Sequence, residues 1–153
     1  MEGIKFDSRQ VLMLTGMEND EQVLSAVADA MCEMGLVKDT YKQAILDREK
    51  EFPTGLNTGG CNIAIPHADV THVNEASICV GILEEPVMFH AMDEPDDLIP
   101  VKMVIMLALK EAHSHLDMLQ KVVELIQDQA LVKQIVETKE KDTVCQLLKE
   151  KLL

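Results

Sequence analysis

The chain has 153 residues, 47% of them hydrophobic, which is enough for one globular domain with a substantial core. Asp and Glu number 27 against 14 Lys and Arg, and the resulting net charge of -13 argues against binding to nucleic acid or to anionic lipid. The longest apolar run, 103–109, is too short to cross a bilayer, and the polar first ten residues do not resemble a signal peptide. Four scattered cysteines without a C-x-x-C pair indicate buried thiols in a reducing cytoplasm rather than disulfides or a zinc site. We therefore expect one cytoplasmic domain over residues 1–153.

The N-terminal third predicts one strand and two helices. Four consecutive apolar residues predict a short strand over 11–14. Asn19 or Asp20 can cap a helix that Gly35 ends, and its apolar residues recur at helical spacing: Val23, Leu24, Val27, Met31 and Met34. Asp39 is expected to cap a second helix, which ends before Pro53.

The rest of the chain predicts strands followed by helices. Strands are expected over 61–65, 76–83 and 103–109, with a shorter piece over 87–89, and the acidic, proline-bearing stretches 84–86 and 91–100 are predicted turns and loops. Three helices should follow, the last capped by Asp142. The predicted inner residues of the first two are Leu116, Leu119, Val123 and Ile126, and then Leu131 and Ile135. The order β-α-α-β-β-β-α-α-α indicates one α/β domain.

The segment 52–69, FPTGLNTGGCNIAIPHAD, combines a glycine-rich loop, a short apolar run and a histidine. Pro66 cannot donate to a sheet ladder, so the strand should end there and place His67 on a loop at the strand end. An imidazole is neutral in much of its population near pH 7 and can attack phosphorus without another base. His67 is therefore a candidate nucleophile that carries a phosphoryl group, although a histidine that merely packs fits the same pattern.

Groups around His67 could bind the phosphoryl oxygens. The glycines of the loop allow backbone N–H groups to approach an anion, and the Thr54 and Thr58 hydroxyls can bond phosphate. The loop carries no cation, because no Lys or Arg occurs between Thr54 and Pro100. This favours brief acceptance of a phosphoryl group over tight storage of an anion. The upstream cation Arg48 can reach the phosphate or pair with the acids beside it.

A second histidine cluster, His113-Ser114-His115, lies after the strand over 103–109, at the start of a helix. Strand ends and helix N-termini favour anions, so His115 can donate to a phosphoryl oxygen or to the reacting imidazole, or it can be an ordinary polar residue at a helix start. His67, His113 and His115 could instead bind a metal in a hydrolase, but no fourth ligand is evident. We expect no metal.

Several of these stretches together resemble one family, the fructose/mannitol type of enzyme IIA domain in the sugar phosphotransferase system. They are the end of the helix at Arg48-Glu49, the Thr54-Gly55 turn, Ile63-Ala64-Ile65-Pro66-His67 and His115-Leu116. Within that family, the Thr-Gly-Leu-x-Thr-Gly loop and Ile-Pro-His-Ala-Asp look most like galactitol-type IIA proteins. Fructose and mannitol members usually have glycine after the active histidine, where this chain has Ala68 and then Asp69.

The resemblance implies a three-layer α/β/α sandwich with a mixed sheet. It also implies that His67 takes phosphate from the phosphocarrier HPr and passes it to a cysteine of a IIB protein, and so to sugar entering through a membrane IIC component. By position, His115 matches the second active-site histidine, and Arg48 and Thr54 match accessory polar positions. An apolar, shallow rim should surround His67. The alternative is a regulatory IIA-like domain whose phosphorylation state controls a partner protein.

Overall fold

A five-stranded mixed sheet forms the centre of the molecule. The computed structural model describes residues 3–153, and its strands have the spatial order β1-β4-β5-β3-β2. β1 runs parallel to β4 and β3 parallel to β5, whereas the β4–β5 and β2–β3 pairs are antiparallel. The strand bounds are β1 (Val11–Leu14), β2 (Gly55–Leu56), β3 (Asn62–Ala64), β4 (Ser77–His90) and β5 (Leu98–Ala108).

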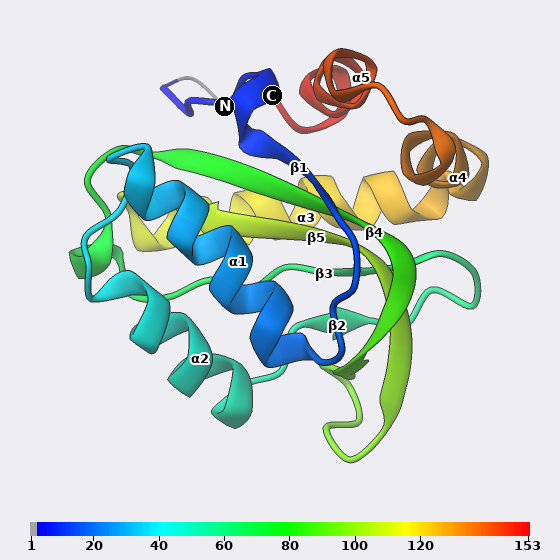
Figure 1. Cartoon of the computed structure of the whole chain (residues 1–153), viewed down its shortest axis with the longest axis horizontal. Helices are drawn as coiled ribbons and strands as arrows, with labels where there is room; N and C mark the ends of the chain where they lie inside the picture. The colour runs from blue at the N-terminus through cyan, green and yellow to red at the C-terminus, as the bar shows by residue number, and fades with distance from the viewer. Residues whose placement is uncertain (1–2) are drawn as a thin grey trace.

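Helices cover both faces of this sheet, which confirms the predicted three-layer fold class (Figure 1). One face carries α1 (Asp20–Glu33) and α2 (Tyr41–Glu51). The other carries α3 (Ala112–Gln127), α4 (Gln129–Glu137) and α5 (Lys141–Leu152). Two short 3-10 helices, Ser8–Gln10 and Val70–His72, complete the order.

The central strand β5 shows how the sequence separates the two cores. Successive strand side chains point to opposite faces. Val104, Met106 and Ala108 accordingly pack with α1 and α2, whereas Met103, Ile105 and Leu107 pack with the C-terminal helices. A strand that is buried on both faces needs a continuous apolar run, and this explains why 103–109 is apolar throughout.

The β4–β5 hairpin is longer than the sequence pattern predicts. The predicted turn at 84–86 lies inside β4, where the register with β5 shifts between Ile82 and Val87, and β5 begins at Leu98 rather than at 103. Residues 84–86 are exposed, so the strand continues beyond the cores and can carry acidic side chains and a proline at an irregularity. The two-residue strand β2 was not predicted, because the glycine-rich loop hides it.

Two predicted inner residues of α3, Leu119 and Ile126, are partly buried and pack against the core. The prediction is wrong for the other half of the inner stripe of α3. Its buried residues are Met118, Val122 and Leu125, whereas Leu116 is 60% exposed and Val123 is 38% exposed. The second helix also begins one residue later than predicted: its N-cap is Thr40, which makes no side-chain cap bond, rather than Asp39. The apolar residues on the outer side of α3 therefore need another explanation than the core.

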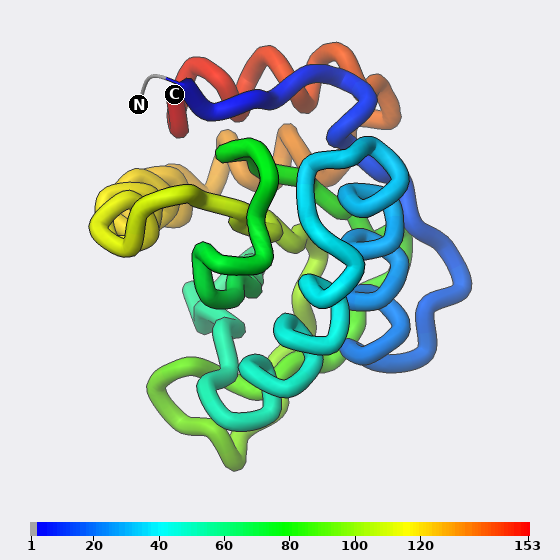
Figure 2. The backbone as a smooth tube through the Cα atoms, turned by 90° about the vertical axis from the view of Figure 1, so that its left-hand side faces the viewer, coloured from blue at the N-terminus to red at the C-terminus, as the bar shows by residue number. Residues whose placement is uncertain are grey.

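The N-terminal segment and α5 lie side by side at one end of the molecule (Figure 2). Within residues 3–153, no helix combines the length and apolar character needed to cross a membrane.

Candidate functional site

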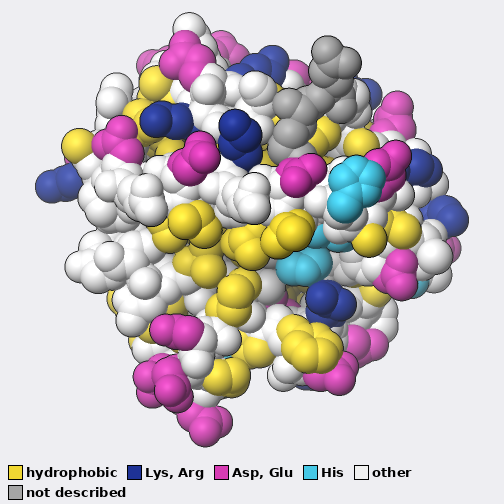
Figure 3. Space-filling view, turned by 180° about the vertical axis from the view of Figure 1, so that it is seen from behind, with side chains coloured by type: hydrophobic (Ala, Val, Ile, Leu, Met, Phe, Trp, Pro, Cys, Tyr) yellow, Lys and Arg dark blue, Asp and Glu magenta, His cyan; other side chains and the backbone are white. Residues whose placement is uncertain are grey.

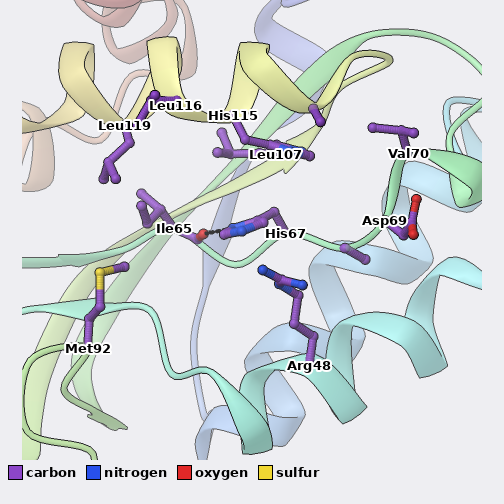
Figure 4. Close-up of a pocket in the computed structure, with 12 residues that line it drawn as sticks. Arg48, Ile65, His67, Asp69, Val70, Met92, Leu107, His115, Leu116 and Leu119 are labelled. Carbon is purple, nitrogen blue, oxygen red and sulfur yellow. Dashed lines mark hydrogen bonds between the residues drawn. The ribbon is translucent and has the colours of Figure 1, made fainter.

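An open cavity of about 470 Å³ lies where the end of β3, the end of β5, α2 and α3 meet (Figure 4). Arg48 comes from α2, and His115 comes from the first turn of α3. The full lining is Arg48, Ile65, His67, Ala68, Asp69, Val70, Met92, Leu107, Ala112, His115, Leu116 and Leu119. The fold thus brings both predicted histidines and Arg48 to one cavity.

The backbone around Pro66 fixes the position of His67. The Leu107 N–H donates to the Pro66 carbonyl at 2.9 Å, and His67 forms an isolated bridge with Leu107. This ties the segment after β3 to the end of β5. Pro66 has no N–H of its own, so the β3 ladder stops there and the chain turns His67 into the cavity.

The His67 imidazole is oriented by the chain's own backbone. Its Nδ1 lies 3.0 Å from the carbonyl oxygen of Ile65, drawn as the dashed line in Figure 4. A carbonyl oxygen can only accept, so Nδ1 carries the hydrogen and donates. In the neutral ring, Nε2 is then left with the free lone pair. The hydrogen bond therefore assigns the tautomer that makes Nε2 the nucleophilic nitrogen.

His115 packs against His67. The two ring centroids are 4.9 Å apart and the ring planes are inclined by 34°. The Nε2 atom of His115 is buried and has no hydrogen-bond partner within the described residues 3–153. An unpaired buried polar atom is uncommon in folded proteins, and one beside a reactive group is a candidate ligand for something that arrives later.

Arg48 is a cation without a carboxylate partner. Its guanidinium lies 5.3 Å from the ring centroid of Phe52, and no Asp or Glu of residues 3–153 forms a salt bridge with it. Figure 4 shows the guanidinium directed toward His67. The sequence allowed Arg48 either to reach the phosphate or to pair with the acids beside it. In the described residues, Arg48 forms no such pair and lines the cavity instead.

Both histidines are held neutral near pH 7. Burial lowers the pKa of His67, the hydrogen bond to Ile65 raises it, and the charge of Arg48 lowers it further. Burial is also the largest cause that lowers the pKa of His115, to about 4, with His67 and Arg48 acting in the same direction and Asp69 opposing them. A neutral His67 keeps its lone pair, which a nucleophile requires.

Thr54 does not line the cavity. It is 2% exposed, and its hydroxyl and its N–H both donate to the Glu49 carboxylate at 2.8 Å. Its carbonyl accepts from Ile65 N at 3.3 Å. The structure therefore makes Thr54 a positioning residue, which links α2 to the strand that carries His67. Sequence reasoning did not single out the buried Glu49 as the partner of Thr54, and its place directly after Arg48 was the available signal.

The predicted anion cradle of the glycine-rich loop is not formed. The Thr58 and Gly60 N–H groups donate to Asn62 Oδ1 and Thr58 Oγ1, and the Cys61 N–H donates to Gln129 Oε1. These donors close the loop on itself and on α4, and none of the loop's residues lines the cavity.

His113 also lies apart from the pair. It bonds Glu111 at 2.9 Å on an exposed surface and borders a different cavity. The three histidines of the proposed metal site therefore do not converge.

Apolar side chains surround the cavity. Figure 3 shows hydrophobic side chains gathered over the centre of this face, beside histidine and basic side chains. Among the lining residues, Leu116 is 60% exposed and Met92 is 38% exposed. This is the apolar rim that the family resemblance implied, and it accounts for the exposure of Leu116 on the outer side of α3. Together these features describe an α/β protein with a mixed sheet and an open, apolar-rimmed cavity that contains a histidine pair.

Comparisons with known proteins identify the family. Residues 5–151 match the family "Phosphoenolpyruvate-dependent sugar phosphotransferase system, EIIA 2", and the chain belongs to it. It is therefore a phosphoryl-transfer component of a sugar phosphotransferase system.

Individual relatives agree with this assignment. The chain is 30% identical over 115 residues to the galactitol-specific EIIA component of Escherichia coli K12, which covers 75% of this chain and 76% of that protein. It is 26% identical over 146 residues to the mannitol-specific enzyme IIA component of Staphylococcus aureus MRSA252, covering 95% of each. Its fold matches the mannitol enzyme IIA solved in complex with phosphorylated enzyme IIB from Escherichia coli, with a TM-score of 0.78, 24% identity and coverage of 96% of this chain and 99% of that one.

Proposed function

We propose that His67 accepts a phosphoryl group from HPr through Nε2 and passes it to a IIB component during sugar uptake. The hydrogen bond from Nδ1 to the Ile65 carbonyl carries this proposal, because it leaves Nε2 as the nitrogen with a free lone pair. The open cavity leaves room for the phosphorus to approach from a partner protein. The proteins meet in the cytoplasm, and the membrane component is reached only through IIB.

The transfer breaks one N–P bond and forms another. The His67 Nε2 lone pair attacks the phosphorus of the donor phosphohistidine in line, and the N–P electron pair returns to the donor imidazole. Little covalent work is needed from the protein, so positioning and charge stabilisation supply most of the catalysis. Arg48 and His115 border the same cavity and are the groups that stabilise the phosphoryl oxygens.

The sugar is galactitol or a related sugar. Support comes from the galactitol-specific relative at 30% identity and from Ala68-Asp69, which follow His67 where fructose and mannitol members usually have glycine. The substrate branch can be tested by offering the phosphorylated protein purified IIB components of galactitol, mannitol and fructose systems. Fastest transfer to the galactitol IIB is expected, and preference for another IIB would reassign the branch.

Two histidine variants test the phosphoryl site itself. After incubation with phosphorylated HPr, His67→Ala should acquire no acid-labile, base-stable phosphate. His115→Ala should still acquire it and should transfer it onward more slowly, by on the order of tenfold to a hundredfold for one lost stabilising donor. His113→Ala, which removes an exposed histidine outside the cavity, is the matched control and should behave as the wild type. Phosphate retained by His67→Ala would refute the assignment.

A further inference from the structure

The unpaired Nε2 of His115 lies beside the residue that will carry the phosphoryl group, and the protonation state of the ring decides what this atom can do there. A neutral imidazole has one nitrogen that donates and one that accepts. In the described residues, the buried Nε2 does neither, although the ring lies 4.9 Å from His67. The atom is therefore buried and unpaired within the described residues, next to the place where negative charge will appear.

Charge accounting shows what phosphorylation does to this pair. The group transferred is formally PO3 with one negative charge, and it joins a neutral His67. The Ile65 carbonyl holds the hydrogen on Nδ1, so that hydrogen remains on the ring when Nε2 forms the N–P bond. The product is an imidazolium ring bearing a doubly negative phosphoryl group, with a net charge of -1. The half-buried cavity then contains a new anion beside a neutral His115.

Resting on the proposed function, we propose that phosphorylation of His67 is coupled to the binding of one proton by His115, which is released when the phosphoryl group moves on. The proton comes from solvent, and it converts His115 to an imidazolium in which both nitrogens donate. The unsatisfied Nε2 position then holds a charge-assisted donor for a phosphoryl oxygen. The net charge of the two residues and the phosphoryl group returns to zero.

The charged groups that face His115 determine whether it binds the proton in the free protein or in the phosphorylated protein. Across the cavity, the neighbouring His67 and the guanidinium of Arg48 oppose a charge on His115, whereas Asp69 favours it. On its own helix, Glu111 is engaged by His113. In the free protein, burial and the charge of Arg48 outweigh the effect of Asp69, and the His115 ring stays neutral. A phosphoryl group on His67 adds two negative charges to a ring whose centroid lies 4.9 Å from that of His115, and it attracts the Arg48 charge to itself, so the balance reverses.

Nuclear magnetic resonance of protein with nitrogen-15 labelled histidine tests this directly. The free protein and the protein phosphorylated by HPr are titrated from pH 8 to pH 5.5, and the five histidines are assigned with single His→Gln variants. At pH 5.5 we expect His115 to be neutral in the free protein and an imidazolium in the phosphoprotein, with the Nδ1 hydrogen of His67 present in both.

A second measurement compares His115→Gln with His113→Gln. Gln keeps an amide donor but cannot bind a proton. The equilibrium constant for phosphoryl transfer from HPr, divided by that of His115→Gln, should change by up to about tenfold per pH unit where the proton is taken up. The equilibrium constant of His113→Gln, divided by that of His115→Gln, should show the same pH dependence, because His113 lies outside the cavity.

The outcomes separate the two proposals. A phosphohistidine signal together with a His115 that stays neutral at pH 5.5, or a His115→Gln protein with the same pH dependence as the wild type, overturns the proton coupling and leaves phosphoryl transfer intact. Failure of the wild-type protein to form any phosphohistidine overturns the proposed function, and the coupling with it.

Discussion

His67 takes its orientation from a main-chain carbonyl, whereas many reactive histidines are oriented by a carboxylate side chain. Because the acceptor is the main-chain carbonyl of Ile65, which every residue type retains, the orienting group cannot be removed by a substitution. A carbonyl also cannot become protonated, so the Nδ1 hydrogen stays in place over the whole working pH range. Stabilisation of the transferred group is therefore left to side chains that approach from other elements.

Arg48 is the first of these side chains to test. We expect Arg48→Gln to slow phosphoryl acceptance from HPr by on the order of tenfold or more, because one charge-assisted donor to the phosphoryl oxygens is lost. Rapid-quench measurements of labelled phosphate on His67 would measure it. Lys50→Gln is the matched control: Lys50 lies on the same helix and pairs with Glu21 at 3.6 Å. Equal rates of phosphoryl acceptance in Arg48→Gln and Lys50→Gln would show that Arg48 does not act in phosphoryl transfer.

Thr54→Val separates positioning from phosphate binding. The Thr54 hydroxyl donates to buried Glu49, so its loss should lower the free energy of unfolding by about 1 kcal/mol, the usual net worth of such a bond. Phosphoryl acceptance should stay within about twofold of the wild-type rate, because the hydroxyl does not face the cavity. Urea unfolding and acceptance kinetics would be compared with Thr58→Val, which removes a loop hydroxyl that bonds Cys61 O. A large rate loss at unchanged stability would return Thr54 to the role of a phosphate ligand.

At the scale of elements, the strand-to-loop transition at Pro66 was predictable from sequence, because it depends on a local property of proline. The residue pattern left the convergence of α2 and α3 on His67 as one of two alternatives, and only the family resemblance implied it, since it depends on which helix faces the packing selects. The stripe at Leu116 and Val123 has helical spacing, but the neighbouring stripe at Met118 and Val122 has it too. Periodicity finds apolar faces and does not say whether another element of the chain or a partner covers them.

The prediction of an anion site in the glycine-rich loop was wrong for a similar reason. The N–H donors of this loop bond to partners elsewhere in the fold, among them Gln129.

The outer face of α3 leads to a prediction about docking. Leu116 is 60% exposed at the rim of the cavity, so Leu116→Ser should weaken partner association with little effect on the folded state. We expect KM for phosphorylated HPr to rise by about fivefold to thirtyfold, the effect of one or two kcal/mol at an apolar contact, with kcat nearly unchanged. Leu153→Ser, at a half-exposed leucine that ends the chain beyond α5, should leave both constants unchanged. A fall in kcat with constant KM would place Leu116 in the chemistry instead.

At the scale of the whole molecule, two buried titratable groups near the site act on stability in opposite directions. Burial raises the pKa of Glu49 to about 7, against the donors of Thr54, which lower it. The pKa of His115 is lowered to about 4, again mainly by burial. As pH falls below 6.5, the ordinary pKa of histidine, His115 binds a proton in the unfolded chain but not in the folded protein. The free energy of unfolding therefore decreases. Glu49 gives the reverse slope over an overlapping range, so the wild-type profile is flatter than either group alone would make it.

Glu49→Gln should expose this compensation. The ordinary pKa of the Glu49 carboxyl is 4.5, and in the folded protein it is about 7. Between pH 4.5 and about 7, Glu49 is therefore protonated in the folded protein and ionised in the unfolded chain. The stability that Glu49 contributes is therefore fully present below pH 4.5 and is lost as pH rises through 7, at most about 3 kcal/mol from the size of the shift. Gln cannot ionise, so urea unfolding of Glu49→Gln at pH 5, 6, 7 and 8 should show the slope of His115 alone. The stability of this variant should rise from pH 5 to about 6.5 and then stay level, where the wild-type profile is flatter. Glu51→Gln, an exposed neighbour on α2, should follow the wild type. A Glu49→Gln profile parallel to the wild type would mean that the carboxylate is ionised in the folded protein, and that the Thr54 donors outweigh burial.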